Sequence, residues 1–247
     1  MSYLSPKLIL VSLAFLTSSL TAYAQTAPIV DLIWEADSYL PAFYPGHSRP
    51  APGSTVRLAA LAHFTDPATG RSLGPESLTY TWSKNGQTMA GVSGLGKDSI
   101  IFSATEQAIF RVAVSYPASG VSAASQVSIS PQPALIKLYY EEPLLGTAYH
   151  QPVATTFEMP EGEINLRAEP FYFSKNAYLN KKIQFQWTIN GENIVSDAAD
   201  PGLITIAKPE TGVGENAFTV TAKNLANVLQ TATNKFTIKF NSSNISF

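Results

Sequence analysis

The sequence predicts an all-β protein made of two tandem β-sandwich domains. Three observations support this fold class: an internal repeat, period-two alternation of apolar and polar residues, and frequent turn residues between the alternating segments. The turns draw on seventeen Pro and fifteen Gly. Beyond residue 24, no window of eleven residues or more shows an amphipathic helical period; only residues 65–77 are expected to hold a single helical turn.

The repeat consists of five features that recur in the same order at offsets of 105 to 109 residues. Such an ordered series indicates a tandem duplication. In chain order, the paired features are Leu32-Ile33-Trp34-Glu35 with Leu138-Tyr139-Tyr140-Glu141, the alternating residues after Gly53 with those after Gly162, Tyr80 to Gly86 with Phe185 to Gly191, Phe110 and Val112 with Phe218 and Val220, and Val127 and Ile129 with Phe236 and Ile238.

Each repeat contains segments typical of half-buried strands and tight hairpins. Apolar and polar residues alternate over residues 55–59 and 79–82, as expected when one face of a strand packs on a core. Asn85-Gly86 and Asn190-Gly191 supply the positive φ angles that a two-residue hairpin turn requires. About seven short strands in ~100 residues, with one Trp on the third, are typical of an immunoglobulin-like sandwich.

The motifs Tyr80-x-Trp82-x-x-Asn85-Gly86 and Phe185-x-Trp187-x-x-Asn190-Gly191 resemble the third strand of immunoglobulin-like and polycystic-kidney-disease-like (PKD-like) modules. The resemblance implies strings of sandwich modules, as in bacterial surface proteins. The paired cysteines of antibody domains are missing, and Ser83-Lys84-Asn85-Gly86 replaces the Asp-Phe-Gly-Asp-Gly turn of the kidney-disease type, so the subfamily stays open. Trp82 and Trp187 are interpreted as structural core residues that fill the space between the sheets.

The N-terminus has the order of a secretory signal peptide. Lys7 precedes an apolar run over residues 8–16, and Ala22-Tyr23-Ala24 precedes Gln25, which predicts cleavage after Ala24. The run is shorter than the ~20 residues that cross a bilayer, and no later segment reaches that length. We therefore expect an exported mature chain of 223 residues with net charge −3 and no membrane span, placed in a periplasm, on a cell surface or outside the cell.

The domains are expected at residues 25–132 and 133–240, after a signal peptide at 1–24 and before a polar tail at 241–247. Alternate prolines in Ser130-Pro131-Gln132-Pro133 favour a short, extended and semi-rigid connection. The two sandwiches should therefore lie end to end with limited hinge freedom.

The composition excludes several classes of protein. Charged residues make up 14% of the chain and apolar residues 45%, which argues against intrinsic disorder. Sixteen basic and eighteen acidic residues leave no positive excess for nucleic-acid phosphates. The chain has no cysteine, which removes disulfides, zinc–thiolate sites and thiol nucleophiles, and which favours a bacterial origin for an exported protein.

Motifs for catalysis, metals or cofactors are weak. Gly91 to Asp98 nearly spells a phosphate-binding loop, but Asp98 replaces the required hydroxyl residue and a strand follows, so a flexible glycine-rich turn is the favoured interpretation. No G-x-S-x-G elbow is present. We therefore predict no catalytic residue, no cofactor and no metal site. The histidines and acidic residues considered and set aside as loop and turn residues are His47, His63, His150, Asp66, Asp197 and Asp200.

The candidate binding residues are Tyr39, Phe43 and Tyr44, which lie among prolines in an irregular segment. One interpretation makes them a stacking surface for a glycan or a peptide. The favoured interpretation folds them against the sandwich as a cover over a sheet edge. Phe171-Tyr172-Phe173 in the second repeat has the same two interpretations.

Together these observations predict a non-enzymatic, exported protein of the cell envelope or surface that acts as a spacer, adhesion or assembly module. Its expected partner is a protein or glycan at the envelope. The alternative is a carbohydrate-binding accessory module that uses exposed aromatic residues, and a hydrolase ranks third. Addition of a partner strand to an open sheet edge is a further possibility.

Overall fold

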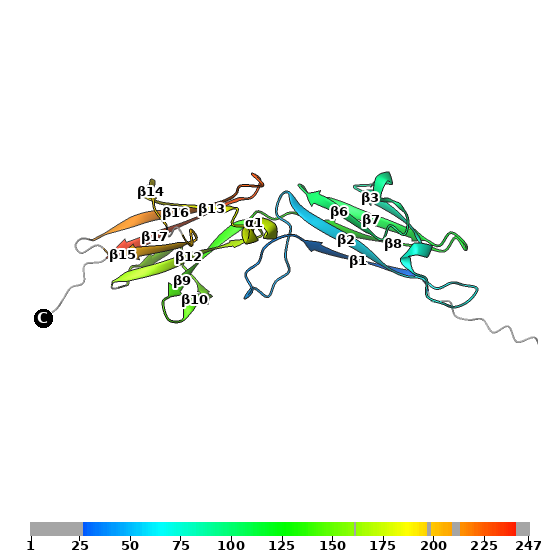
Figure 1. The fold of residues 1–247 in the computed structure, drawn as a ribbon, viewed down its shortest axis with the longest axis horizontal. Helices are drawn as coiled ribbons and strands as arrows, with labels where there is room; N and C mark the ends of the chain where they lie inside the picture. The colour runs from blue at the N-terminus through cyan, green and yellow to red at the C-terminus, as the bar shows by residue number, and fades with distance from the viewer. Residues whose placement is uncertain (1–26, 161, 197–198, 209–212, 241–247) are drawn as a thin grey trace, which may run out of the picture.

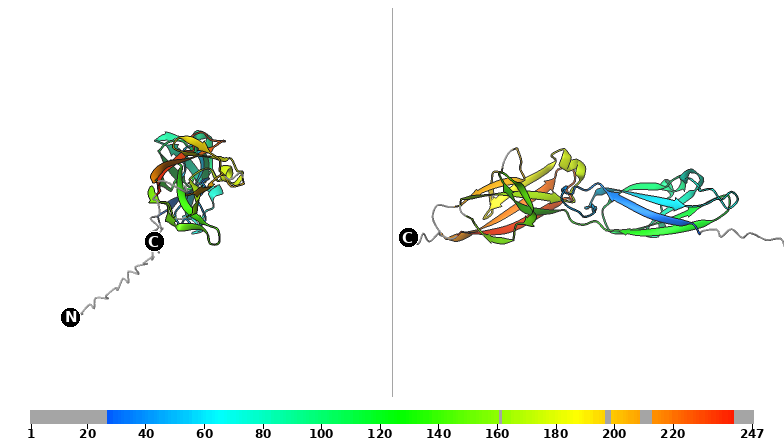
Figure 2. Two further views of the ribbon diagram at one scale, coloured as in Figure 1. Left: turned by 90° about the vertical axis from the view of Figure 1, so that its left-hand side faces the viewer. Right: turned by 90° about the horizontal axis from the view of Figure 1, so that it is seen from below.

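The computed structural model describes residues 27–160, 162–196, 199–208 and 213–240, which form two β-sandwiches placed end to end (Figure 1). The molecule is narrow when seen along its length and elongated when seen from below (Figure 2). The predicted signal peptide and polar tail lie outside the described residues.

The first domain pairs β1, β2 and β6 in one antiparallel sheet and β4, β3, β7 and β8 in the other, and β5 pairs with β3 along the same edge as β4. Two single 3-10 turns, η1 (Pro75–Ser77) and η2 (Ala90–Val92), lie between strands. Its strands are β1 (Ile29–Ala36), β2 (Ser54–His63), β3 (Thr79–Lys84), β4 (Gln87–Thr88), β5 (Gly94–Leu95), β6 (Ser99–Ala104), β7 (Ala108–Ser115) and β8 (Ser122–Ile129).

The second domain has sheets in the orders β10-β9-β12-β15 and β11-β17-β16-β13-β14. Strand β11 is parallel to β17, whereas the other pairs are antiparallel. A short helix, α1 (Lys175–Leu179), joins the two sheets. Its strands are β9 (Leu135–Glu142), β10 (Gly146–Pro152), β11 (Thr156–Glu158), β12 (Glu163–Phe171), β13 (Ile183–Ile189), β14 (Glu192–Ile194), β15 (Leu203–Ala207), β16 (Gly214–Asn224) and β17 (Thr231–Phe240).

The two domains share one connectivity. The chain passes from β2 to β3 in the opposite sheet, returns to β6 and crosses again to β7, and it repeats this path through β12, β13, β15 and β16. These crossovers between two antiparallel sheets are those of an immunoglobulin-like sandwich. The predicted fold class of two tandem all-β sandwiches is therefore confirmed. The five repeated sequence features fall on equivalent strands, and the Ser130-Pro133 segment lies between β8 and β9.

The two tryptophans occupy equivalent core positions. Trp82 on β3 and Trp187 on β13 are among the largest fully buried side chains. The Trp82 indole Nε1–H donates a hydrogen bond to the carbonyl of Lys97 at 2.8 Å, and that of Trp187 donates to the carbonyl of Pro201 at 3.0 Å. Both acceptors precede the strand that returns to the opposite sheet. Each indole thus fills the core and ties the incoming segment to it.

The predicted asparagine–glycine hairpin turns are present in both domains. Asn85 and Gly86 have φ angles of 49° and 81°, and Asn190 and Gly191 have 50° and 90°. The Asn85 backbone N–H donates to the carbonyl of Ile109 at 2.8 Å, while its Oδ1 accepts from the Ile109 N–H at 2.9 Å. Asn190 makes the same pair of bonds with Ala217. The asparagine side chain therefore fastens the turn to the neighbouring strand.

Helix α1 was not predicted from the sequence, because its five residues are too few to show a helical period. The single turn expected within residues 65–77 occurs as η1.

Replacing Trp82 by Phe should lower the free energy of unfolding by about 2 kcal/mol, because the change leaves a void in the core and removes the donor to the Lys97 carbonyl. Urea denaturation measures the effect. The control is Trp34→Phe, the same change at a partly buried ring on β1, which should cost less. Equal losses would contradict the role assigned to Trp82.

Candidate functional site: the aromatic contact between the two domains

The segment between β1 and β2, residues 37–53, extends from the first domain onto the second. The Tyr39 N–H donates to the carbonyl of Phe173 at 2.6 Å, and the Tyr172 N–H donates to the carbonyl of Tyr39 at 2.9 Å. These two bonds pair Tyr39 with the end of β12 in the manner of neighbouring strands. The loop therefore belongs to the first domain by sequence and to the second domain by contact.

The rings of this segment stack on rings of the second domain. The Tyr39 ring lies 3.5 Å, centroid to centroid, from that of Tyr178 on α1, and the two planes are nearly parallel. The Phe43 ring lies 3.8 Å from Tyr149 on β10 and contacts Tyr139 on β9 edge-on at 5.6 Å. All three predicted binding residues take part, since Tyr44 packs edge-on against the buried ring of Phe171 at 5.6 Å.

The Phe43 and Tyr44 rings belong to a third apolar cluster, apart from the two sandwich cores. Pairs of aromatic rings at such distances contribute ~0.5–1.5 kcal/mol beyond the area that they bury. The cluster therefore acts as a core of its own for the junction. Its buried members are Ala51, Tyr139, Phe171 and Tyr172, and its partly buried members are Leu40, Phe43, Tyr44, Leu135 and Tyr149.

Local backbone chemistry shapes the segment for this contact. Prolines at 41, 45, 50 and 52 fix φ and reduce the entropy lost when the segment becomes ordered. Gly46 leaves room for the Tyr44 ring, which a Cβ at position 46 would meet. On the other side, Tyr172 has φ = 66°, a left-handed conformation that is costly for an aromatic residue. Its backbone bond to Tyr39 helps to hold it there.

A buried polar network joins the domains beside the rings. The Gln230 side chain, from the second domain, donates through Nε2 to Ser54 Oγ of the first domain at 3.2 Å. Its Oε1 accepts from the Ser174 N–H at 2.9 Å and from Asn224 Nδ2 at 2.7 Å. Ser54 Oγ also accepts from the Ala51 N–H at 3.1 Å. Because buried polar groups are costly unless they are paired, this network favours one relative orientation of the domains.

Glu169 on β12 lies directly under the aromatic contact. Its side chain is buried, and Oε1 accepts a hydrogen bond from the Tyr149 hydroxyl at 3.0 Å, whereas Oε2 has no hydrogen-bond partner. Burial raises the pKa of the Glu169 carboxyl, although the Tyr149 hydroxyl and Arg167 act in the opposite direction. Burial likewise raises the pKa of the Tyr39, Tyr139 and Tyr149 phenols, with the Glu169 charge adding to it. The neutral forms of these groups are therefore favoured at the junction.

Arg167, two residues before Glu169, is held by a separate ionic cluster. Its Nε donates to Glu141 at 2.8 Å, and its Nη1 donates to Asp200 at 2.8 Å. Burial opposes ionisation of Glu141, but the hydrogen bonds from Arg167 and Thr147 outweigh it and lower the pKa of its carboxyl. The cluster holds β9, β12 and the turn before β15 together. Asp200, set aside in the sequence as a turn residue, is thus engaged by an arginine, and Asp197 lies outside the described residues.

The remaining sequence candidates stand apart from the contact. The three histidines, His47, His63 and His150, are exposed at separate places, and His63 lies 3.5 Å from the exposed carboxylate of Asp31. Asp66 caps its own turn by accepting from the Ala68 N–H at 2.9 Å. Over the described ranges, no group of three or more histidine, aspartate and glutamate residues is placed to hold a metal ion.

The glycine-rich segment after β4 is hydrogen-bonded to Trp82. Ser93 Oγ accepts from the Trp82 backbone N–H at 2.9 Å and donates to the carbonyl of Met89 at 2.9 Å, while the indole reaches Lys97. The segment is therefore a turn, as the sequence predicts, and these bonds connect it to Trp82.

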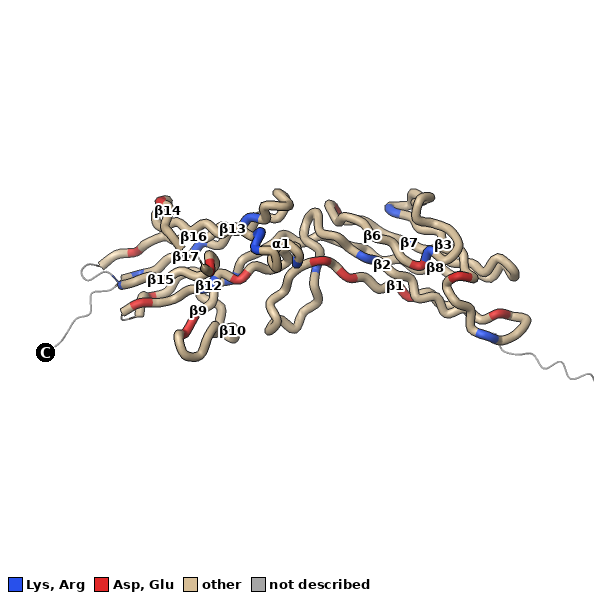
Figure 3. Tube along the Cα trace, viewed as in Figure 1, with Lys and Arg blue, Asp and Glu red and all other residues tan. Residues whose placement is uncertain are grey.

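The surface is sparsely charged. Lys and Arg are dispersed among Asp and Glu along both domains, and in the part of the chain that Figure 3 describes they do not form a basic stripe. No described helix is long and apolar enough to span a bilayer. The aromatic contact is therefore the largest specialised feature that sets the two domains apart from plain sandwiches.

The comparisons with known proteins return only structural likenesses. No family model and no curated protein matches the chain. The chain is similar to three N-terminal domains of the Highly Immunogenic Outer Capsid protein (Hoc) of bacteriophage RB49, at 17% identity and a TM-score of 0.47, over 87% of this chain and 59% of that one. It is also similar to fibronectin(III)-like modules of Clostridium thermocellum CbhA, at 12% identity and a TM-score of 0.27, over 87% of this chain and 97% of that one.

A third likeness is to Bacteroides ovatus SGBP-B, solved in complex with a mixed-linkage heptasaccharide, at 13% identity and a TM-score of 0.26, over 88% of this chain and 48% of that one. The chain thus spans less than two thirds of the phage and Bacteroides ovatus chains. At these identities and TM-scores the likenesses carry no functional argument. Strand order and pairing define the class: a two-domain, all-β protein of immunoglobulin-like sandwiches joined by a folded aromatic contact.

The buried Glu169 predicts a pH dependence of stability. Its folded-state pKa lies above the ordinary unfolded value of about 4.3. The protonated carboxyl therefore stabilises the fold below that pH, and this contribution is lost as the pH rises through the folded-state pKa. The free energy of unfolding of the wild type, minus that of Glu169→Gln, should fall as the pH rises from the unfolded-state pKa toward the folded-state pKa of Glu169 and should level off above it. Urea denaturation across this range measures the difference.

Glu163→Gln is the control, because it removes one acidic group from an exposed position of the same strand. The same trend in both variants would show that charge on β12 in general, rather than burial of Glu169, causes the dependence.

Proposed function

We propose that this chain is a non-enzymatic, exported protein of a bacterial cell envelope or surface that acts as a rigid two-domain spacer and assembly module. The observation that carries the proposal is the insertion of residues 39–46 into the second domain. A chain that only tethered two domains would need no such contact. A chain that holds two surfaces at a fixed distance and angle benefits from one.

The linker at Ser130-Pro133 and the segment between β1 and β2 together hold the two domains in this role. The Gln132 N–H donates to the carbonyl of Pro50 at 2.7 Å, so the connection between the domains is bonded to the segment that crosses the junction. Two residues further along that segment, the carbonyl of Pro52 accepts from Asn227 Nδ2 at 3.2 Å. The junction is therefore held along the linker, by the rings and through the loop before β17. Contacts on several sides of a junction restrict both bending and twisting.

The predicted signal peptide supports the exported location that we propose. A chain without cysteine depends on core packing and on the junction for its stability outside the cell. The carbohydrate-binding alternative is less well supported, because the rings of Tyr39, Phe43 and Tyr44 already pack on rings of the second domain. Sugar stacking on those faces would require the junction to open.

Replacing Phe43 by Ser should loosen the junction, because the change removes the ring that lies against Tyr139 and Tyr149 and weakens the contact by about 2 kcal/mol. The absence of cysteine allows two spin labels to be placed uniquely, at Gln126→Cys on β8 and Lys223→Cys on β16. Pulsed electron-spin resonance should give one narrow distance distribution for the otherwise unchanged chain and a broader one for the Phe43→Ser variant.

Leu95→Ser is the matched control, since Leu95 is an exposed apolar residue of the first domain on β5, outside the aromatic cluster. It should leave the distribution narrow. A broad distribution before any change at Phe43 would contradict the rigid-spacer proposal.

A further inference from the structure

The outer faces of the two equivalent sheets differ in what covers them. Strand pairing places Ile33 opposite Ala59 in the first domain, and at the equivalent position it places Tyr139 opposite Arg167 in the second. Two residues further along the same face, Leu61 lies opposite Asp31 in the first domain and Glu169 lies opposite Lys137 in the second. The register is the same in both domains, so the two faces can be compared position by position.

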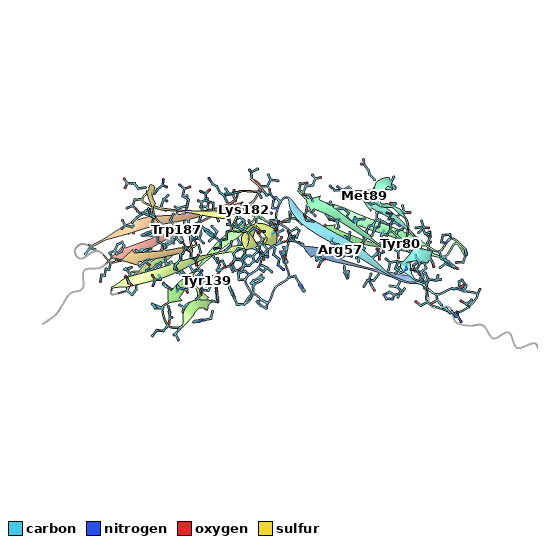
Figure 4. The ribbon with its side chains drawn as sticks, in the orientation of Figure 1. Arg57, Tyr80, Met89, Tyr139, Lys182 and Trp187 are labelled. Carbon is cyan, nitrogen blue, oxygen red and sulfur yellow. The ribbon has the colours of Figure 1, made fainter. Side chains whose placement is uncertain are left out.

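In the second domain this face is covered. Residues 39–46 and the Tyr149 side chain from the edge strand β10 cover it, so Tyr139 and Glu169 are only 2% and 5% exposed. In the first domain the equivalent residues, Ile33 and Leu61, are 53% and 46% exposed. Arg57 on the open face and Tyr139 on the covered one are labelled in Figure 4. The first domain therefore presents, uncovered, the face that the second domain buries.

The open face is hollowed where the second domain receives a ring. A surface cavity of about 350 Å³ is lined by Ile33, Trp34, Glu35, Arg57 and Ala59. Ile33 and Ala59 provide an apolar floor at the positions equivalent to Tyr139 and Arg167. In the second domain, Phe43 and Tyr149 pack against Tyr139. A cavity of this size accommodates an aromatic side chain together with part of its backbone.

The charged rim of the hollow also differs from its counterpart. In the second domain, Arg167 is bonded to Glu141 and Asp200. In the first domain, Arg57 lies opposite Glu35 across β1 and β2, and within the described part of the chain no ion pair or side-chain hydrogen bond engages its guanidinium. A partner that brings a carboxylate or carbonyl oxygen to the Arg57 side of the rim, away from Glu35, and an aromatic ring to the floor would complement both.

We propose that the hollow on the outer face of β1 and β2 is a docking site for an extended segment of a partner protein that carries an aromatic side chain next to an acidic residue. The occupant has the chemistry of the chain's own segment between β1 and β2, in which Asp37 precedes Tyr39, and it covers the first domain as that segment covers the second. The inference deepens the proposed assembly role by naming the surface and the kind of partner.

The probe is a synthetic peptide with the sequence of residues 35–46, which contains both acidic groups and all three rings. It is titrated into the full mature chain while backbone amide resonances are followed by NMR. The expected result is a saturable set of shifts in β1 and β2 around Ile33 and Ala59. A peptide with serine in place of Tyr39, Phe43 and Tyr44 should produce none.

Three variants sharpen the test. Ile33→Asp should weaken peptide binding about tenfold or more, because it places a charge in the apolar floor, which is equivalent to at least ~1.4 kcal/mol. Arg57→Ala should weaken it several-fold. Ile109→Asp is the matched control, since Ile109 is an exposed isoleucine on β7 of the opposite sheet, and it should bind as the wild type does.

Shifts confined to β9 and β12 would mean that the peptide only displaces the chain's own segment, and they would overturn the proposal, as would the absence of shifts. Concentration-dependent shifts at Ile33 without peptide would overturn it in favour of contact between copies of this chain. None of these results alters the distance distribution that tests the rigid spacer, so failure of the docking site and failure of the proposed function are distinguishable.

Discussion

The packing of residues 39–46 against the second domain is the interaction on which the shape of the molecule depends. Two sandwiches joined only by a short proline-containing linker would retain hinge freedom, because small interdomain contacts normally permit relative motion. Here the loop carries three rings across the junction and pairs its backbone with the end of β12. Each domain packs around its own tryptophan, and this contact joins the two domains.

The interactions that could be predicted from the sequence are local or repeated. The Asn-Gly turns need only two adjacent residues, and the core role of Trp82 follows from its register with Trp187. The partner of the Tyr39 ring, by contrast, is Tyr178, far away in the chain and on a helix too short to show a period. The available signal was a second aromatic run at Phe171-Tyr172-Phe173, but alternation within one segment does not show which other segment it meets.

Apolar packing alone does not explain why the junction adopts one orientation. Flat rings can slide over one another at little cost, whereas a buried amide or carboxyl must keep its few partners. Gln230 is completely buried and reaches Ser54 across the junction, so a rotation that breaks this bond would leave the Gln230 Nε2 group buried without this acceptor. Glu169, with one oxygen unpartnered beneath the rings, imposes a cost that depends on its protonation. The polar groups thus select the orientation that the rings stabilise.

The two domains have similar residues on the inner faces of their sheets but different residues on the outer faces. Val56 and Leu58 match Ile164 and Leu166 as buried residues, because any loss of volume there would open a cavity. Outward positions carry no such constraint, and Leu61 and Glu169 share a position with different chemistry. In the second domain, residues 39–46 of the same chain cover this face, so the buried carboxyl of Glu169 is tolerated there. In the first domain Ile33 and Leu61 are exposed to water. Because only 14% of the residues are charged, charge repulsion does little to prevent such an apolar surface from associating. A partner that covers Ile33 and Leu61 would remove this apolar surface from water, as residues 39–46 do for the second domain.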